Sequence, residues 1–176
     1  GRWAKTKGKL RVFGHTNGVK AVRDTVEGAA EIGIKYLTLY AFSTENWNRP
    51  EKEVNALMTL LVSTINKETK TLMDNNIRLQ AIGNIEQLPT KCQKELKEAI
   101  AKTKDNSRMI LILALSYSSR WEIINAVKNM IKEGLSENEV TEDTFQQYLT
   151  TKGVPDPELL IRTSGEYRIS NFLLWQ

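Results

Sequence analysis

The stretch FSTENWNRP at residues 42–50 constrains this chain more than any other part of its sequence. An apolar, β-rich run at residues 36–41 comes directly before it. A long helical pattern beginning at Pro50 follows, with proline at a favoured first helical position. The stretch is therefore predicted to be a turn from a buried strand into a helix. It would lie at the carboxyl end of the strand, which is the edge where open α/β sheets bind ligands.

This turn contains more polar chemistry than a connection requires. A simple turn needs little beyond a Gly, Asn or Asp. Here two hydroxyls, a carboxylate, two carboxamides, an indole and a guanidinium follow one another between Ser43 and Arg49. This content favours a functional site. The alternative interpretation is a helix cap with Trp47 packed on the core.

The hydrophobic periodicity of the whole chain predicts an α/β fold. The run at 109–115 is continuously apolar, which is typical of a parallel strand covered on both faces. We therefore predict a single domain over residues 1–176, with a mainly parallel central sheet flanked by helices. The wide apolar face of 51–75 is assigned to the core, with a hydrophobic channel as the alternative. The expected helices are 17–32, 51–75, 89–104, 120–131 and 142–149, and the expected strands are 36–41, 77–82, 109–115 and 159–161.

Composition excludes several classes of protein. A length of 176 residues with 40% hydrophobic residues fits one domain with a substantial core. The single cysteine, Cys92, cannot form an internal disulfide, which indicates a reducing, cytoplasmic compartment. No apolar run reaches the roughly 18 residues of a membrane span. Neither the common nucleotide-binding motifs nor a His- or Cys-rich metal motif is present.

Basic residues are expected to gather at one edge of the sheet. The net charge is +4 without a run of five or six like charges, which favours a basic cleft for an anion over a nucleic-acid-binding tail. The turns SYSSRWEI at 116–123 and RTSGEYRIS at 162–170 also follow predicted strands, and parallel strand ends meet at one edge. Arginines without acidic partners are costly unless an anion is bound, so a phosphate or diphosphate ligand is predicted. The alternative is pairing with Glu45 or Glu166. The arginines expected to converge are Arg2, Arg11, Arg49, Arg162 and Arg168.

The first fifteen residues are a second candidate anion-binding segment. Glycines that permit close backbone approach are interspersed with arginines and lysines that contact phosphate oxygens. His15, the only histidine, is expected just before a helix start, where the helix N-terminus attracts anions. A solvated basic loop is an alternative of equal weight.

Five segments together resemble the cis-prenyltransferases, and most closely the bacterial undecaprenyl diphosphate synthases. They are GRWA from Gly1, RVFGH ending at His15, LYAFSTENWNRP from Leu39, SYSSRWEI from Ser116 and the final LLIRTSGEYRISNFLLWQ. The resemblance covers nearly the whole chain. It implies a Mg²⁺-dependent homodimer that adds isopentenyl diphosphate units to farnesyl diphosphate in cis and grows the product inside a hydrophobic tunnel. The product would be undecaprenyl diphosphate, the lipid carrier precursor for cell-wall glycan, delivered to the membrane by a cytoplasmic or peripheral inner-face enzyme.

The resemblance also assigns roles to individual residues. Asn46 matches the residue usually described as the proton acceptor. A neutral carboxamide does not titrate near neutral pH, so orienting a diphosphate oxygen or a water is the role expected here. The substrate-binding positions implied are Gly1, Arg2, Arg11 and His15 for the allylic diphosphate, Trp3 as a flanking substrate contact, Ser43, Thr44, Glu45, Trp47 and Arg49 beside the reacting carbons, and Arg162, Arg168, Ile169 and Ser170 for isopentenyl diphosphate. The tunnel positions implied are Val19, Val26, Leu39, Ala41 and Leu60.

The sequence departs from the family pattern at the expected metal ligands. The resemblance places one Mg²⁺-binding Asp before Gly1 and a Glu after Gln176, and neither is in the sequence. Tyr167 stands where many bacterial members have a metal-linked His. The first core strand is also expected before Gly1. We therefore expect a longer active enzyme, and no condensation by the 176-residue chain alone. Two alternatives stay open: a non-catalytic partner subunit of the same fold, and a nucleic-acid-binding module that uses the basic edge, although nucleic acid is not the expected partner.

Overall fold

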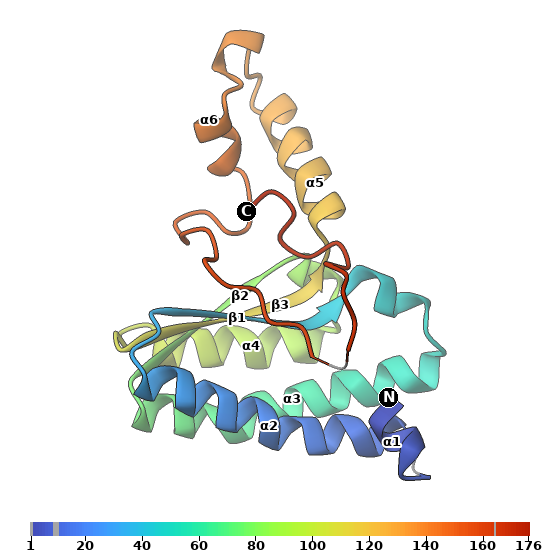
Figure 1. The fold of residues 1–176 in the computed structure, drawn as a ribbon. Helices are drawn as coiled ribbons and strands as arrows, with labels where there is room; N and C mark the ends of the chain where they lie inside the picture. The colour runs from blue at the N-terminus through green and yellow to red at the C-terminus, as the bar shows by residue number, and fades with distance from the viewer. Residues whose placement is uncertain (1, 9–10, 164) are drawn as a thin grey trace.

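The computed structural model describes residues 2–8, 11–163 and 165–176, without the side chains of Arg2, Lys5, Arg11, Val12, His15 and Thr16. The fold is a single α/β domain whose parallel three-stranded sheet is flanked by helices (Figure 1). The strands are β1 (Tyr36–Ser43), β2 (Ile77–Ile82) and β3 (Met109–Tyr117), in the spatial order β1-β3-β2. The predicted fold class is confirmed.

The apolar run predicted to be a buried strand is the central strand β3. It pairs in parallel with both neighbours, for example Leu113 with Leu39 and Leu111 with Leu79. Alternate residues of a strand point to opposite faces, so β3 contributes Leu111 to one core and Ile112 to the other. Burial on both faces explains why this strand is apolar throughout.

The larger core lies between one face of the sheet and a layer of three helices, α2 (Arg11–Glu31), α3 (Glu51–Asp74) and α4 (Thr90–Thr103) (Figure 1). Val26 of α2 and Leu96 of α4 are among its buried side chains. The periodic patterns predicted all three helices, although α2 begins six residues before the expected start at 17.

The opposite face carries a smaller core that the C-terminal segment completes. Phe172 packs with Ile82 and Ile112, and its ring stacks on Tyr40 with centroids 4.4 Å apart. From this side α5 (Ser119–Lys132) and α6 (Glu142–Gln146) project away from the sheet (Figure 1). These two helices pack together around Ala126, Met130, Phe145 and Leu149.

Two expectations about local structure are wrong. Residues 159–161 do not form a strand; no described strand pairs with them, and each side chain is more than half exposed. A three-residue run without a neighbouring strand has no partner for its backbone groups. The N-terminal basic segment is not a loop either. It forms α1 (Arg2–Thr6) and the start of α2, so His15 lies within α2 rather than before it. Tertiary packing overrides weak local propensities at such glycine-containing positions.

Three short 3₁₀ turns complete the described elements: η1 (Thr44–Asn48), η2 (Ile85–Gln87) and η3 (Glu137–Glu139). Gly83, between β2 and η2, has a φ of +107°, and a Cβ there would lie 2.3 Å from the carbonyl oxygen of Leu115. Only glycine permits this close approach of the two backbones at the carboxyl edge of the sheet. Among the helices in the described parts of the chain, none has the length and apolar character to cross a membrane.

Candidate active site

The polar turn after β1 is fixed by its own side chains. The register of β1 shifts on either side of Phe42, which is a bulge of the kind found beside active sites. The η1 turn follows, and the Ser43 backbone N–H donates to Asn46 Oδ1 at 3.2 Å. This contact engages the carboxamide oxygen of Asn46. The NH₂ group is therefore the part of Asn46 that can donate to a ligand.

Trp47 anchors the same turn to the end of β3. Its Nε1–H donates to Ser116 Oγ at 2.9 Å, and the Ser116 hydroxyl donates in turn to Gln87 Oε1 at 2.7 Å. The indole packs edge-on against Phe42, with ring centroids 4.9 Å apart. A cap and an indole packed on the core, the alternative interpretation of this sequence, are thus both present. Direct substrate contact by Trp47 stays a prediction.

Asn171 joins the ends of β1 and β3 to the C-terminal segment. Its Nδ2 donates to Glu45 Oε1 at 3.0 Å, which links residues 126 positions apart. Its backbone and side-chain oxygens accept the N–H groups of Ser119 at 2.9 Å and Arg120 at 3.0 Å. Asn171 adopts a positive φ of +58°, which Asn tolerates better than most residues. One side chain therefore sets the spacing of three polar segments at this edge.

The carboxylate of Glu45 is held in its charged form. Partial burial raises its pKa, but hydrogen bonds from Asn171 and from the Ser43 and Thr44 hydroxyls stabilise the anion and hold the pKa below its usual value. Glu45 is thus an acceptor at neutral pH, and its contact with Asn171 is charge-assisted.

Two of the predicted anion-binding arginines have carboxylate partners. Arg49 Nη1 lies 2.9 Å from Glu53 Oε1, and Arg168 Nη1 lies 2.9 Å from Glu166 Oε2. The expectation that these arginines lack acidic partners is therefore wrong for both. The alternative of pairing with Glu166 is confirmed. A guanidinium has five N–H donors, so each can contact an anion while keeping its carboxylate.

Arg162 closes the loop on which it lies. Its Nη1 donates to the carbonyl oxygen of Arg168 at 2.8 Å and to Ser170 Oγ at 2.7 Å. Ile169 and Tyr167 of this loop are exposed. Three residues assigned to isopentenyl diphosphate are thus held in one compact loop.

The N-terminal site residues are only partly described. Gly1 and the side chains of Arg2, Arg11 and His15 lie outside the described residues, so the convergence of five arginines stays a prediction. Trp3 is described, and it stacks on Phe13 with centroids 5.9 Å apart and ring planes 1° from parallel.

An apolar cavity of about 440 Å³ lies between the sheet and the helices α2 and α3. It reaches Ala41 and Phe42, which directly precede the polar turn. The predicted tunnel residues Val19, Val26, Leu39, Ala41 and Leu60 all line this cavity. Their role in holding a growing chain stays a prediction. The apolar face of α3 belongs both to the core and to the cavity wall.

The described residues do not fit a complete Mg²⁺ site. Among the side chains that the structure describes, no group of three potential metal ligands lies together. Glu45, Glu53 and Glu166, which lie near the polar edge, are each engaged in the contacts above.

Sequence reasoning missed the residues that hold this edge together. Glu122 is buried, and its carboxylate accepts the Tyr117 hydroxyl at 2.7 Å and the Thr150 backbone N–H at 2.9 Å. Burial raises the pKa of Tyr117, so its hydroxyl stays a donor. The Ser119 hydroxyl accepts the Leu174 N–H at 2.8 Å. The hydroxyl-rich motif SYSSRWEI is the signal in the sequence that could have indicated these contacts.

Comparison with known proteins identifies one family over the whole length of the chain. A family model described as putative undecaprenyl diphosphate synthase matches residues 1–176. The chain is 51% identical over 180 residues to the isoprenyl transferase of Chlorobaculum tepidum, covering all of this chain and 68% of that protein. It is also 51% identical to a ditrans,polycis-undecaprenyl-diphosphate synthase of Pasteurella multocida, named as specific for (2E,6E)-farnesyl diphosphate, covering all of this chain and 75% of that protein.

Solved structures give the same result. Lavandulyl diphosphate synthase from Lavandula x intermedia, solved with dimethylallyl diphosphate, superposes with a TM-score of 0.95 at 36% identity, over 99% of this chain and 78% of that one. A probable undecaprenyl diphosphate synthase from Campylobacter jejuni superposes with a TM-score of 0.81 at 36% identity, over 91% of this chain and 74% of that one. The fold and these similarities thus define a prenyl-transferring enzyme. More narrowly, the chain belongs to the undecaprenyl diphosphate synthase family of cis-prenyltransferases.

Proposed function

We propose that this enzyme lengthens farnesyl diphosphate by successive cis additions of isopentenyl diphosphate, to give undecaprenyl diphosphate. The observation that carries the proposal is the apolar cavity whose lining includes Ala41 and Phe42, the residues directly before the polar turn. A diphosphate head and a prenyl tail require this pairing of a polar edge with an apolar interior. The relatives named for undecaprenyl diphosphate synthesis support the choice of substrate and product.

The chemistry proposed breaks the allylic carbon–oxygen bond and sends its electron pair to the departing diphosphate. The double bond of isopentenyl diphosphate attacks the allylic carbon, a new carbon–carbon bond forms, and one proton is lost. Negative charge develops on the leaving diphosphate, where preorganised cations are most effective. Arg49 is assigned to that charge. Arg162 and Arg168, in the loop closed by Ser170, are assigned to the second diphosphate.

Asn46 is assigned an orienting role in this reaction. Its oxygen accepts the Ser43 N–H, so its NH₂ group is the donor available to a diphosphate oxygen or a water. The proton then passes to that oriented oxygen rather than to Asn46. Growth of the chain is favoured because each methylene that enters the cavity contributes about 0.8 kcal/mol.

A second copy of the chain is part of the proposal. Helix α5 exposes Ile124, Val127 and Ile131, with exposed fractions of 56%, 40% and 72%. Their spacing places them on one side of the helix. A stripe of this kind is suited to a homodimer interface. Sedimentation should give a dimer, and Ile124→Glu with Ile131→Glu should give a monomer; a monomeric wild type would contradict the assignment.

Dependence on Mg²⁺, a cytoplasmic or membrane-peripheral location and a role in cell-wall lipid supply complete the proposal. They rest on the family resemblance. Chelation of divalent ions should abolish turnover by the full-length enzyme and should be reversed by added Mg²⁺. Polynucleotide should bind no better than inorganic diphosphate.

The test incubates full-length enzyme with farnesyl diphosphate and labelled isopentenyl diphosphate, and sizes the products by chromatography. Long polyprenyl products are expected; absence of chain extension would refute the function. Asn46→Ala should lower kcat by about 10²-fold, the usual effect of removing one preorganised donor. Asn46→Asp keeps an oxygen for the Ser43 N–H but removes the NH₂ donor. It should be at least as impaired, whereas a true base at this position would be restored by Asp.

A further inference from the structure

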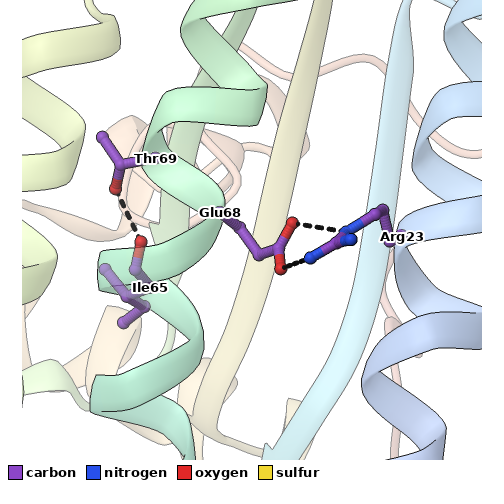
Figure 2. A network of polar contacts seen from close by, with 4 residues as sticks. All are labelled: Arg23, Ile65, Glu68 and Thr69. Carbon is purple, nitrogen blue, oxygen red and sulfur yellow. Dashed lines mark hydrogen bonds and ion pairs between the residues drawn. The ribbon is translucent and has the colours of Figure 1, made fainter.

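One ion pair crosses from α2 to α3 at the wall of the cavity. Arg23 Nε donates to Glu68 Oε2 at 2.9 Å, and Arg23 Nη2 donates to Glu68 Oε1 (Figure 2). Both side chains line the cavity, whose other walls are mostly apolar. Two parallel N–H···O contacts fix the relative position of the two residues more strictly than one contact would. The pair therefore holds the two helices together along this side of the cavity.

The pair lies well inside the cavity, measured from its polar end. Among the α3 residues on the cavity wall, Leu57 is nearest the polar turn, and Glu68 follows eleven residues later. At a rise of about 1.5 Å per residue, Glu68 is roughly 16 Å further along the helix. Three bonds of an extended chain span about 3.5 Å, so an isoprene unit of four such bonds spans about 5 Å. Roughly three units therefore fit before the pair is reached.

The volume of the whole cavity, which continues past Glu68 to Thr71 and Leu72, sets a similar limit. A cavity of about 150 Å³ accommodates benzene, with six carbon atoms. On that scale, the observed volume of about 440 Å³ accommodates roughly 18 carbon atoms. This suits a chain of three isoprene units, but a chain of eleven units requires a wider space. Since the sheet forms one wall, widening requires α2 and α3 to separate.

Two features allow the pair to open reversibly. Glu27 also lines the cavity, one turn after Arg23 on α2, so Arg23 keeps an acidic neighbour when Glu68 moves away. Next to Glu68, the Thr69 hydroxyl donates to the Ile65 carbonyl at 2.6 Å (Figure 2). Such bonds to the preceding turn weaken and bend helices. The Arg23 side chain is 46% exposed and that of Glu68 18%, so water can solvate the separated charges.

We propose that the Arg23–Glu68 pair is a latch that discriminates by chain length: it stays closed over a chain of three isoprene units and must open for longer chains. The proposal rests on the proposed function of the cavity. It makes Arg23 and Glu68 specificity-determining residues that touch neither diphosphate. Breaking the pair should favour long chains selectively, because only long chains require the separated helices.

The test compares dissociation constants for farnesyl diphosphate and octaprenyl diphosphate on the full-length enzyme, without isopentenyl diphosphate so that no chain grows. Glu68→Gln and Arg23→Gln should each tighten octaprenyl binding by about two- to fivefold, as expected for a partly exposed ion pair, and leave farnesyl binding unchanged. The double variant Arg23→Glu with Glu68→Arg should restore the wild-type ratio of the dissociation constants for farnesyl and octaprenyl diphosphate. Lys70→Gln is the matched control, since it removes an exposed ion pair with Asp74 on the same helix and should change neither constant.

Each alternative result has a definite meaning. Equal changes for both ligands would show general loosening and would overturn the latch, as would an unchanged ratio in both single variants. Failure of the wild type to bind farnesyl diphosphate would overturn the proposed function and the latch together. Under turnover, the single variants should give a longer mean product than the wild type.

Discussion

The anchoring role of Asn171 leads to a prediction whose magnitude can be worked from the structure. Asn171→Gly keeps the positive φ of +58° but removes the side-chain contacts to Glu45 and to the Arg120 N–H. A hydrogen bond contributes about 1 kcal/mol net. Both contacts face solvent in part, so a loss of about 1–2 kcal/mol is expected. Asn171→Ala adds the cost of a left-handed backbone, about 1 kcal/mol or slightly more, and should lose about 2–3 kcal/mol in all.

Urea unfolding of the full-length enzyme measures these losses in the free energy of unfolding. The comparison holds when the m-value, the slope of that free energy against urea concentration, is the same in wild type and variant. Because Asn171 positions the loop that contains Arg162, both variants should also raise KM for isopentenyl diphosphate more than they lower kcat. A value for Asn171→Gly within about 0.5 kcal/mol of the wild type, the usual range for a neutral surface change, would refute the anchoring role. Equal stability of the Ala and Gly variants would refute the backbone argument.

Three further predictions concern the same edge. Gly83→Ala should destabilise the enzyme by at least about 3 kcal/mol in thermal or urea unfolding, because the added Cβ meets the Leu115 carbonyl at 2.3 Å in a left-handed backbone; a wild-type midpoint would contradict this. Trp47→Phe should cost about 1–2 kcal/mol and leave the fold intact by circular dichroism, because buried Ser116 loses its donor; no loss would mean that Ser116 is satisfied otherwise. Glu45 has a folded-state pKa below its unfolded value, so its stabilising effect is present above about pH 5 and is lost as pH falls through the folded pKa. The difference in Tm between wild type and Glu45→Gln should therefore disappear in acid, and a constant difference would disprove the linkage.

Local patterns identified most of the elements. The strand at residues 77–82 has the predicted bounds, and β1 and β3 each extend two residues beyond the predicted end. Helices α3, α4 and α5 agree with their predicted bounds to within one residue. These features are readable because burial repeats every two residues in a strand and every three or four in a helix. The five ordered motifs, including that of residues 42–50, likewise indicated the family.

Contacts between distant segments could not be read in this way. Local pattern also predicted a strand at 159–161, where no strand in the described part of the chain pairs with it. It left the arginines without partners, although Arg49 and Arg168 each have a carboxylate within 2.9 Å.

Local sequence patterns established the order and type of most elements and the chemistry available at the edge of the sheet. Only the tertiary structure decided which side chains meet: Asn171 with Glu45 across 126 positions, and Arg23 with Glu68 across 45. The physical reason is that the period of a strand or helix depends on neighbours a few residues away. A side-chain pair between elements depends instead on how the whole layer of helices packs against the sheet.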